Sequence, residues 1–120
     1  MSESPQTYTE TEMGDPALFA LFFLRARAES HRLRREGKNP ISQGTYVVDF
    51  AVRFEQQFKV PLPTQQGQQI FRLHYRRGFD ELQAKGLVRG GGPDEQLGVW
   101  LPAEVDFERI TPGSVTLKEG

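Results

Sequence analysis

The stretch from Thr64 to Leu101 limits the folds open to this chain more than any other part of its sequence. It opens with a polar segment of helical periodicity that stops at Gly86, a residue type that ends a helix in the left-handed region at little cost. Two short apolar segments follow at 87–89 and 97–101, and a glycine-rich connection at 90–96 separates them. This order predicts a long helix followed by an antiparallel hairpin with a long mobile tip.

The helix is expected over residues 64–85, with Thr64 as its N-cap, and its two faces differ in chemistry. At 100° per residue, one arc of aromatic, aliphatic and small residues contains Phe71, Tyr75, Gly78, Phe79 and Leu82. A separate polar stripe contains Gln65, Gln69, Arg72 and Arg76, with Gln68 beside it. We expect the first arc to pack inward and the second to face solvent.

Two more helices are expected before this one. The first begins at Asp15-Pro16, an N-cap followed by a proline, and continues to residue 36. The second is expected over 43–58 with Ser42 as its N-cap, after a connector that has room for a short strand around Ile41. Its inward stripe comprises Val47, Phe50, Ala51, Phe54 and Phe58. A proline-rich bend then separates the second helix from the third.

The first helix is apolar nearly all round in its first half, so that half needs cover on more than one side. Leu18, Leu21 and Phe22 share the face that would turn to the core, whereas Phe19 and Phe23 lie toward another. We therefore predict a homodimer through the first helix, at Phe19 and Phe23. Cover by the C-terminal segment is the alternative.

The chain is expected to form one domain with two extensions. Residues 1–14 are polar and acidic, which predicts a disordered tail. Residues 15–102 hold the three helices and the hairpin. Residues 103–120 contain few apolar side chains, and we expect an irregular C-terminal extension with at most one short strand.

Charge and composition narrow the function. The net charge is -1, yet residues 25–89 hold thirteen Lys or Arg against six Asp or Glu, which suggests a surface for a polyanion. The absence of cysteine excludes disulfides and thiolate metal sites. No secretion signal is recognisable, and the apolar run at 17–24 is far shorter than the roughly 20 residues that span a bilayer. We expect a cytoplasmic protein with no membrane partner.

Catalysis has little support in the sequence. His31 and His74 are far apart, no motif joins either of them to a serine or a carboxylate, and no cluster has metal-ligand spacing. The glycines at 90–92 lack the lysine and the following helix of a phosphate-binding loop. We therefore expect no enzyme activity and no cofactor.

Nucleic-acid binding has better support. An α-helix fits the major groove of DNA, and Arg and Gln pair with guanine and adenine edges. The base-reading candidates are Gln65, Gln68, Gln69, Arg72 and Arg76. The candidates for phosphate contacts are Arg53, Lys59, Arg77 and Arg89. The alternative is that Gln and Arg occur here because they are good exposed helix formers.

The run from Phe79 to Arg89, followed by a glycine-rich turn and Gly98-Val99-Trp100-Leu101, resembles the winged-helix (winged helix-turn-helix) DNA-binding superfamily. It is similar to GntR-type and MarR-type regulators over about residues 41–102. The resemblance implies a mainly α fold of three helices plus a two- or three-stranded antiparallel wing, with double-stranded DNA as ligand and often a dimer. The wing tip departs from the pattern, because Asp94 and Glu95 stand where Arg or Lys is usual.

We therefore expect a double-stranded DNA-binding protein that places helix 64–85 in the major groove, as a transcriptional regulator or a replication or partition factor. The alternative is a winged-helix protein-interaction module, or an inhibitor subunit, that does not bind DNA. The acidic wing and the Phe19/Phe23 face favour that alternative. Steep salt dependence would distinguish phosphate contacts from an apolar protein contact.

Overall fold

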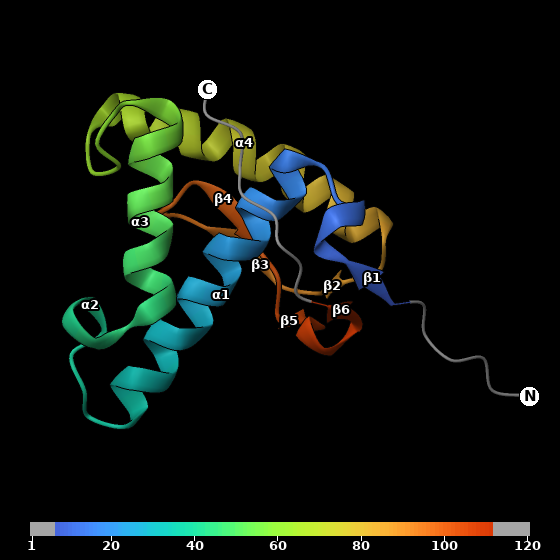
Figure 1. The fold of residues 1–120 in the computed structure, drawn as a ribbon, viewed down its shortest axis with the longest axis horizontal. Helices are drawn as coiled ribbons and strands as arrows, with labels where there is room; N and C mark the ends of the chain where they lie inside the picture. Colours follow the sequence, from blue (N-terminus) through green and yellow to red (C-terminus); the bar gives the residue numbers. More distant parts are fainter. Residues whose placement is uncertain (1–6, 112–120) are drawn as a thin grey trace, which may run out of the picture.

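A computed structural model describes residues 7–111, apart from the side chains of residues 41 and 42. The fold is mainly helical with a small antiparallel hairpin (Figure 1). The helices are α1 (Asp15–Arg35), α2 (Pro40–Gln43), α3 (Thr45–Phe58) and α4 (Gln65–Ala84), with short 3-10 turns η1 (Glu10–Glu12) and η2 (Phe107–Arg109). The strands are β1 (Tyr8–Thr9), β2 (Val88–Arg89), β3 (Gly92–Asp94), β4 (Val99–Leu101), β5 (Glu104–Val105) and β6 (Ile110–Thr111).

The core forms around α1, because both α3 and α4 pack against it. Phe19 is only 2% exposed, and its ring centroid lies 5.4 Å from that of Phe50 and 5.9 Å from that of Phe71. The Phe23 ring lies 4.8 Å from the Phe71 ring in an edge-to-face arrangement that aromatic pairs favour. The predicted need for a dimer contact at Phe19 and Phe23 is therefore wrong. α3 and α4 together cover the apolar sides of α1, including the side for which the sequence indicated no partner within the chain.

α1 and α4 approach each other closely at Gly78. A Cβ atom placed there would lie 1.8 Å from the carbonyl oxygen of Pro16 and 2.8 Å from the Cβ of Ala20, so only glycine fits without movement of the backbone. α1 itself begins at Asp15 with Gly14 as its N-cap, one residue from the predicted boundary. The inward arc predicted for α4 is confirmed, since its buried residues include Phe71, Tyr75, Gly78, Phe79 and Leu82.

Both ends of α4 follow the signals in the sequence. The Thr64 hydroxyl accepts a hydrogen bond from the Gly67 amide at 3.0 Å and donates one to the Pro61 carbonyl oxygen at 2.7 Å. It thereby joins the first turn of α4 to the bend before it. Beyond the other end, Gly86 has a φ angle of 72°, the left-handed value expected of a glycine that ends a helix.

The start of α3 differs from the prediction. α3 begins two residues later than expected, and its N-cap is Gly44. Ser42 lies inside the short helix α2, which also replaces the strand expected around Ile41. The Glu29 carboxylate accepts a hydrogen bond from the Tyr46 amide at 3.2 Å, so α1 satisfies an N–H group in the first turn of α3. Glu29, which is distant in the sequence, therefore caps an N–H group of α3, a role that was predicted for Ser42.

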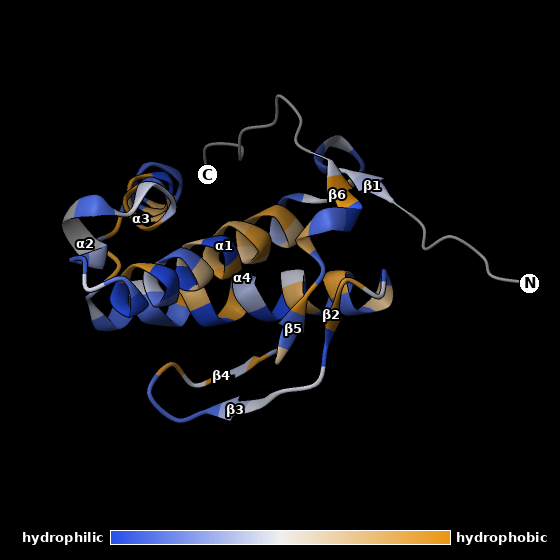
Figure 2. Ribbon diagram, turned by 90° about the horizontal axis from the view of Figure 1, so that it is seen from below, coloured by the Kyte–Doolittle hydropathy of each residue, from blue (hydrophilic) through white to orange (hydrophobic). Residues whose placement is uncertain are grey.

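The strand pairing also differs, although an antiparallel hairpin is present. β2 pairs with β5, with Val88 opposite Val105, instead of pairing with β4. β4 pairs with β3, a segment expected to be loop, with Pro93 opposite Trp100. Two glycines between β2 and β3 have φ angles of 65° and 96°, and they turn the chain so that the hairpin starts later. Figure 2 shows the β3–β4 hairpin along one side of the helices.

The two extensions are more ordered than predicted. β1 and β6 pair in parallel, with Tyr8 opposite Ile110 (Figure 2). Glu10 is 4% exposed and forms an ion pair with Arg25 of α1, and Met13 joins the core. The predictions of a disordered tail at 7–14 and an irregular extension at 103–111 are therefore wrong. The rest of both predictions, at 1–6 and 112–120, lies outside the described residues.

Candidate nucleic-acid interface

The polar stripe of α4 lies at the surface. All five base-reading candidates are exposed: Gln65, Gln68, Gln69, Arg72 and Arg76. Within residues 7–111, Arg76 takes part in no hydrogen bond or ion pair, so its guanidinium is available for a ligand. Asp80 follows Arg76 by one turn and is also exposed, which places one acidic group beside the stripe.

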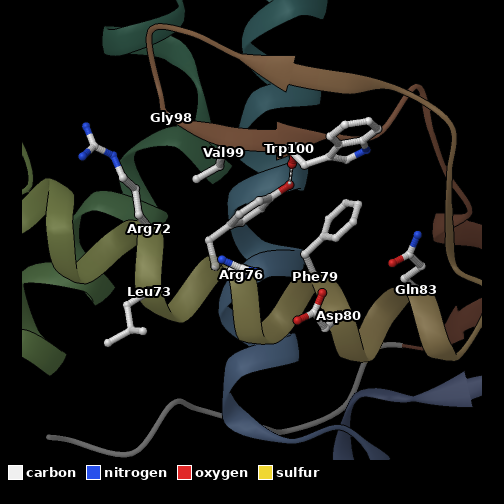
Figure 3. Close-up of a pocket in the computed structure, with 10 residues that line it drawn as sticks. Arg72, Leu73, Arg76, Phe79, Asp80, Gln83, Gly98, Val99 and Trp100 are labelled. Carbon is white, nitrogen blue, oxygen red and sulfur yellow. Dashed lines mark hydrogen bonds between the residues drawn. The ribbon is translucent and has the colours of Figure 1, made fainter.

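The hairpin formed by β3 and β4 contacts this stripe at Arg72. Arg72 Nε donates a hydrogen bond to the carbonyl oxygen of Leu97 at 3.0 Å, and its Nη2 lies 3.5 Å from Oε1 of Gln68. The Tyr75 hydroxyl donates to the carbonyl oxygen of Trp100 at 2.9 Å (Figure 3). Burial raises the pKa of the Tyr75 phenol far above its ordinary value, so the hydroxyl stays a donor well into the alkaline range. The hairpin thus rests on the side of α4 that carries Arg72 and Gln68.

A groove of about 570 Å³ separates β4 from α4 (Figure 3). Its lining combines aromatic, aliphatic and charged side chains: Arg72, Leu73, Tyr75, Arg76, Phe79, Asp80, Gln83, Gly98, Val99 and Trp100. Leu73 is 52% exposed and Trp100 is 47% exposed, which is high for large apolar side chains. The indole Nε1 of Trp100 donates to the Gly90 carbonyl oxygen at 3.3 Å, which holds the edge of the ring against the hairpin.

The four phosphate-contact candidates differ in their availability. Arg77 and Lys59 are exposed and have no ion-pair partner in the described part of the chain. Arg53 pairs with Asp49 at 2.8 Å and lies 4.9 Å over the ring of Phe22, so much of its charge is already balanced. Arg89 is exposed and lies 3.9 Å from a carboxylate oxygen of β5, a weak surface pair.

A second basic surface, on the last three turns of α1, was not assigned a role from the sequence. It consists of Arg27, His31, Arg34 and Arg35, which we call the α1 basic cluster. Burial lowers the pKa of His31, and the positive charges of Arg27, Arg34 and Arg35 lower it further. The neighbouring Arg25 and Arg32 are paired with glutamates and lie outside this cluster. His31 and Arg34 follow Arg27 by 4 and 7 residues, and this spacing in the sequence indicates that the three side chains share one helix face.

The charges around the hairpin are partly balanced. The charge of Arg27 favours the ionised form of the Tyr75 phenol, and the Tyr75 hydroxyl bonds to β4 directly. The acidic residue Asp94 is turned inward within the hairpin, where its carboxylate accepts a hydrogen bond from the Leu97 amide at 2.9 Å. Glu95 stays exposed at the tip. Part of the acidity predicted to oppose DNA is therefore used to form the turn.

The two histidines have separate surroundings. The His74 ring lies 4.6 Å from the Phe58 ring and 6.2 Å from the Phe19 ring, at the edge of the core. Burial lowers the pKa of His74, and the charge of Arg77 lowers it further. His31 lies in the α1 basic cluster instead. Among residues 7–111, no three His, Asp or Glu side chains are grouped so that they could hold a metal ion.

Over the described residues, none of the helices has the length and apolar character needed to cross a lipid bilayer. The chain matches no protein-family model, and neither curated proteins nor solved structures show significant similarity to it.

Proposed function

We propose that this protein binds double-stranded DNA and that α4 enters the major groove. The observation that carries the proposal is the exposed stripe of Gln65, Gln69 and Arg76 on a helix whose opposite face is fixed in the core. Arg and Gln are the side chains that pair bidentately with guanine and adenine in that groove. Arg72 belongs to the same surface, although the hairpin engages one of its N–H groups.

The proposal includes a winged-helix arrangement. α1, α3 and α4 precede the β3–β4 hairpin in the order that this arrangement requires, and the hairpin lies beside α4, where a wing would lie. β2 and β5 form the base from which the hairpin leaves. The exposed Arg77 and Lys59, together with the α1 basic cluster, would supply phosphate contacts that add affinity without reading sequence. Transcriptional regulation, replication and partition are all compatible roles.

The decisive experiment removes two cations of α4 that have no ion-pair partner within residues 7–111, through Arg76→Ala with Arg77→Ala. Binding to a mixed-sequence duplex, measured by fluorescence anisotropy, should weaken at least tenfold. The slope of log affinity against log salt should become shallower by about one, because Arg77 is the phosphate-contact candidate of this pair and roughly one counterion is released for each phosphate contact. Arg72 is left intact, because its loss would also loosen the hairpin.

The matched control is Arg32→Ala with Lys38→Ala, which removes two cations that both pair with Glu36. This control should bind DNA within about twofold of the parent, because both cations pair with Glu36 and lie outside the proposed contact residues. Equal losses in the two double variants would show that only net charge matters. An α4 variant that binds like the parent would show that the assigned face is wrong.

A second candidate function is protein recognition through α3. Val48 and Val52 are four residues apart on one face and are 48% and 45% exposed, and Tyr46 on the same helix is 48% exposed. The argument based on Phe19 and Phe23 no longer supports this candidate, because both rings pack within the chain. A contact at Val48 and Val52 should persist as salt rises, whereas DNA binding should weaken steeply between about 50 and 200 mM salt.

A further inference from the structure

The groove between α4 and β4 has different chemistry at its two ends. Arg72 and Arg76 lie one helical turn apart toward the end of the groove nearer the start of α4. Asp80 and Gln83 lie on the next two turns, toward the other end. The first end therefore attracts an anion, and the second end offers hydrogen-bond acceptors and a donor.

The wall of the groove between these ends is apolar and contains an aromatic ring. Trp100 is 47% exposed, yet the hydrogen bond from its Nε1 to Gly90 holds the edge of the ring. Phe79 lies on α4 facing the same space and Leu73 lies at its margin (Figure 3). A fixed and exposed indole is a suitable platform for a flat ligand, because little side-chain freedom remains to be lost on binding.

A nucleotide has the matching arrangement, with an anionic phosphate, a flat base and hydrogen-bonding groups at the edge of that base. Its size also suits the groove, since about 570 Å³ lies within the usual range for small-ligand sites. Stacking on an aromatic side chain beside basic groups is the general way in which proteins hold unpaired bases. Bases within a duplex do not expose their faces in this way.

We propose that this groove binds a nucleotide unit of single-stranded nucleic acid, with the base on Trp100 and the phosphate at Arg72 and Arg76. The site shares these two arginines with the proposed duplex-binding face, and it deepens that proposed function. A protein with both sites would bind where duplex and single strand meet. The exposed stripe would hold the paired part, and the groove would take the first unpaired base.

The test uses the intrinsic fluorescence of Trp100, the only tryptophan in the chain. An oligodeoxythymidine should quench this fluorescence, whereas a blunt duplex of the same length should leave it nearly unchanged. Quenching by the duplex alone would overturn the proposal. Anisotropy of a labelled oligodeoxythymidine then gives the affinity of variants that lack the indole.

Two variants of Trp100 distinguish stacking of a base on the aromatic ring from contact with any large apolar side chain. Trp100→Phe keeps an aromatic face and should bind the labelled single strand within about threefold of the parent. Trp100→Leu keeps an apolar side chain without that face and should bind roughly tenfold more weakly, the range expected for one lost base stack. Circular dichroism and the thermal midpoint of each variant show whether the fold is retained. Equal binding by a folded Trp100→Leu variant and the parent would overturn the proposal.

A third variant keeps the failure of this proposal distinct from that of duplex binding. Gln65→Ala with Gln69→Ala changes only side chains outside the groove. This variant should weaken duplex binding or change its sequence preference, and it should leave oligodeoxythymidine binding intact. If the parent binds no duplex but its Trp100 is still quenched, the proposed function fails and the groove assignment stands. The converse result, duplex binding without any effect of single strands on Trp100, rejects the groove alone.

Thymidine monophosphate distinguishes the two sources of this ligand chemistry. Quenching by the monophosphate at concentrations similar to those needed for the oligonucleotide, counted per nucleotide, would assign the groove to a free nucleotide. Quenching by the oligonucleotide at far lower concentration would assign it to a nucleic-acid strand, because further phosphates then reach the surrounding arginines. Either result supports the groove as a nucleotide site, and quenching by neither overturns it.

Discussion

The two sides of α4 are held in different ways. Toward α1, the contact consists of aromatic rings and a backbone approach at Gly78 that leaves no room for a Cβ atom. Toward the β3–β4 hairpin, it consists of hydrogen bonds from Arg72 and Tyr75 to main-chain carbonyl groups, and a groove lies beside them. The first side determines whether the chain folds. The second side can change or accept a ligand without loss of the core.

The largest expected effect tests the α1 side, through Gly78→Ala. The added Cβ would overlap the carbonyl oxygen of Pro16, so the two helices must move apart, and we expect a loss of about 3 kcal/mol or more. Gly92→Ala on the hairpin is the control, since no atom lies within 4 Å of the added Cβ. It should change stability by less than about 0.5 kcal/mol. Urea unfolding measures both, and equal losses would refute the contrast between the two sides.

Tyr75→Phe tests the residue that belongs to both sides. The ring and its contacts in the core remain, but the carbonyl oxygen of Trp100 loses its hydrogen bond. We expect a cost of about 1 kcal/mol. Hydrogen exchange should become faster at the amides of the hairpin and stay unchanged in α1. Faster exchange spread evenly over the whole core would show that the hairpin and the helices open as one unit.

Arg72→Ala should have a smaller effect, because its hydrogen bond to Leu97 is exposed to water. We expect at most about 0.5 kcal/mol in global stability, with faster exchange confined to the hairpin. Arg76→Ala is the control one turn away, since Arg76 has no partner within residues 7–111 and its loss should leave hairpin exchange unaltered. If both variants open the hairpin equally, the Arg72–Leu97 bond does not hold it.

The smallest expected effect is on pH dependence. The folded state lowers the pKa of His74 below its ordinary value of 6.5, chiefly by burial against Phe58 and Phe19 and further through Arg77. The unfolded chain therefore binds a proton more readily, and stability should be complete above about pH 6.5 and fall as the pH drops below it. His74→Gln should reduce this slope, and His31→Gln should remove a further part. If the dependence of stability on pH is unchanged in the double variant, other titratable groups cause it.

The sequence predicted α4 well because the signals for a helix are local. The 100° spacing identified Phe71 and Tyr75 as buried and Gln69 and Arg76 as exposed, and Thr64 lies at the helix start as expected. Each of these features depends on residues only a few positions apart. The exposed stripe of the candidate site could therefore be read directly from the chain.

The hairpin pairing could not be predicted in the same way. β3 contains a proline and a glycine and has no β-like pattern, so the sequence favours β2 as the partner of β4. The observed register depends on the turn at Gly90 and Gly91, whose positive φ angles redirect the chain before β3. The Trp100 groove was missed for the same reason, because it exists only where the hairpin rests on α4.

The packing of the aromatic core could not be predicted from the periodicity of single helices. Phe19 contacts rings from both α3 and α4, and no periodicity within α1 shows that three helices meet at that point. The buried pair of Glu10 with Arg25 was equally invisible, since an acidic residue in a polar segment predicts exposure. Contacts between distant segments account for most of the corrections.

The parallel pairing of β1 with β6 has a practical consequence for rearranging the chain. Tyr8 and Ile110 lie opposite each other, so a short linker could join positions 8 and 110 and new ends could be opened at Gly37, which has no neighbouring atoms within 4 Å of an added Cβ. Such a circular permutant would keep α3, α4 and the groove in one uninterrupted segment. A chain that began at residue 14 would instead lack Glu10 and leave Arg25, whose side chain is only 16% exposed, without this carboxylate partner.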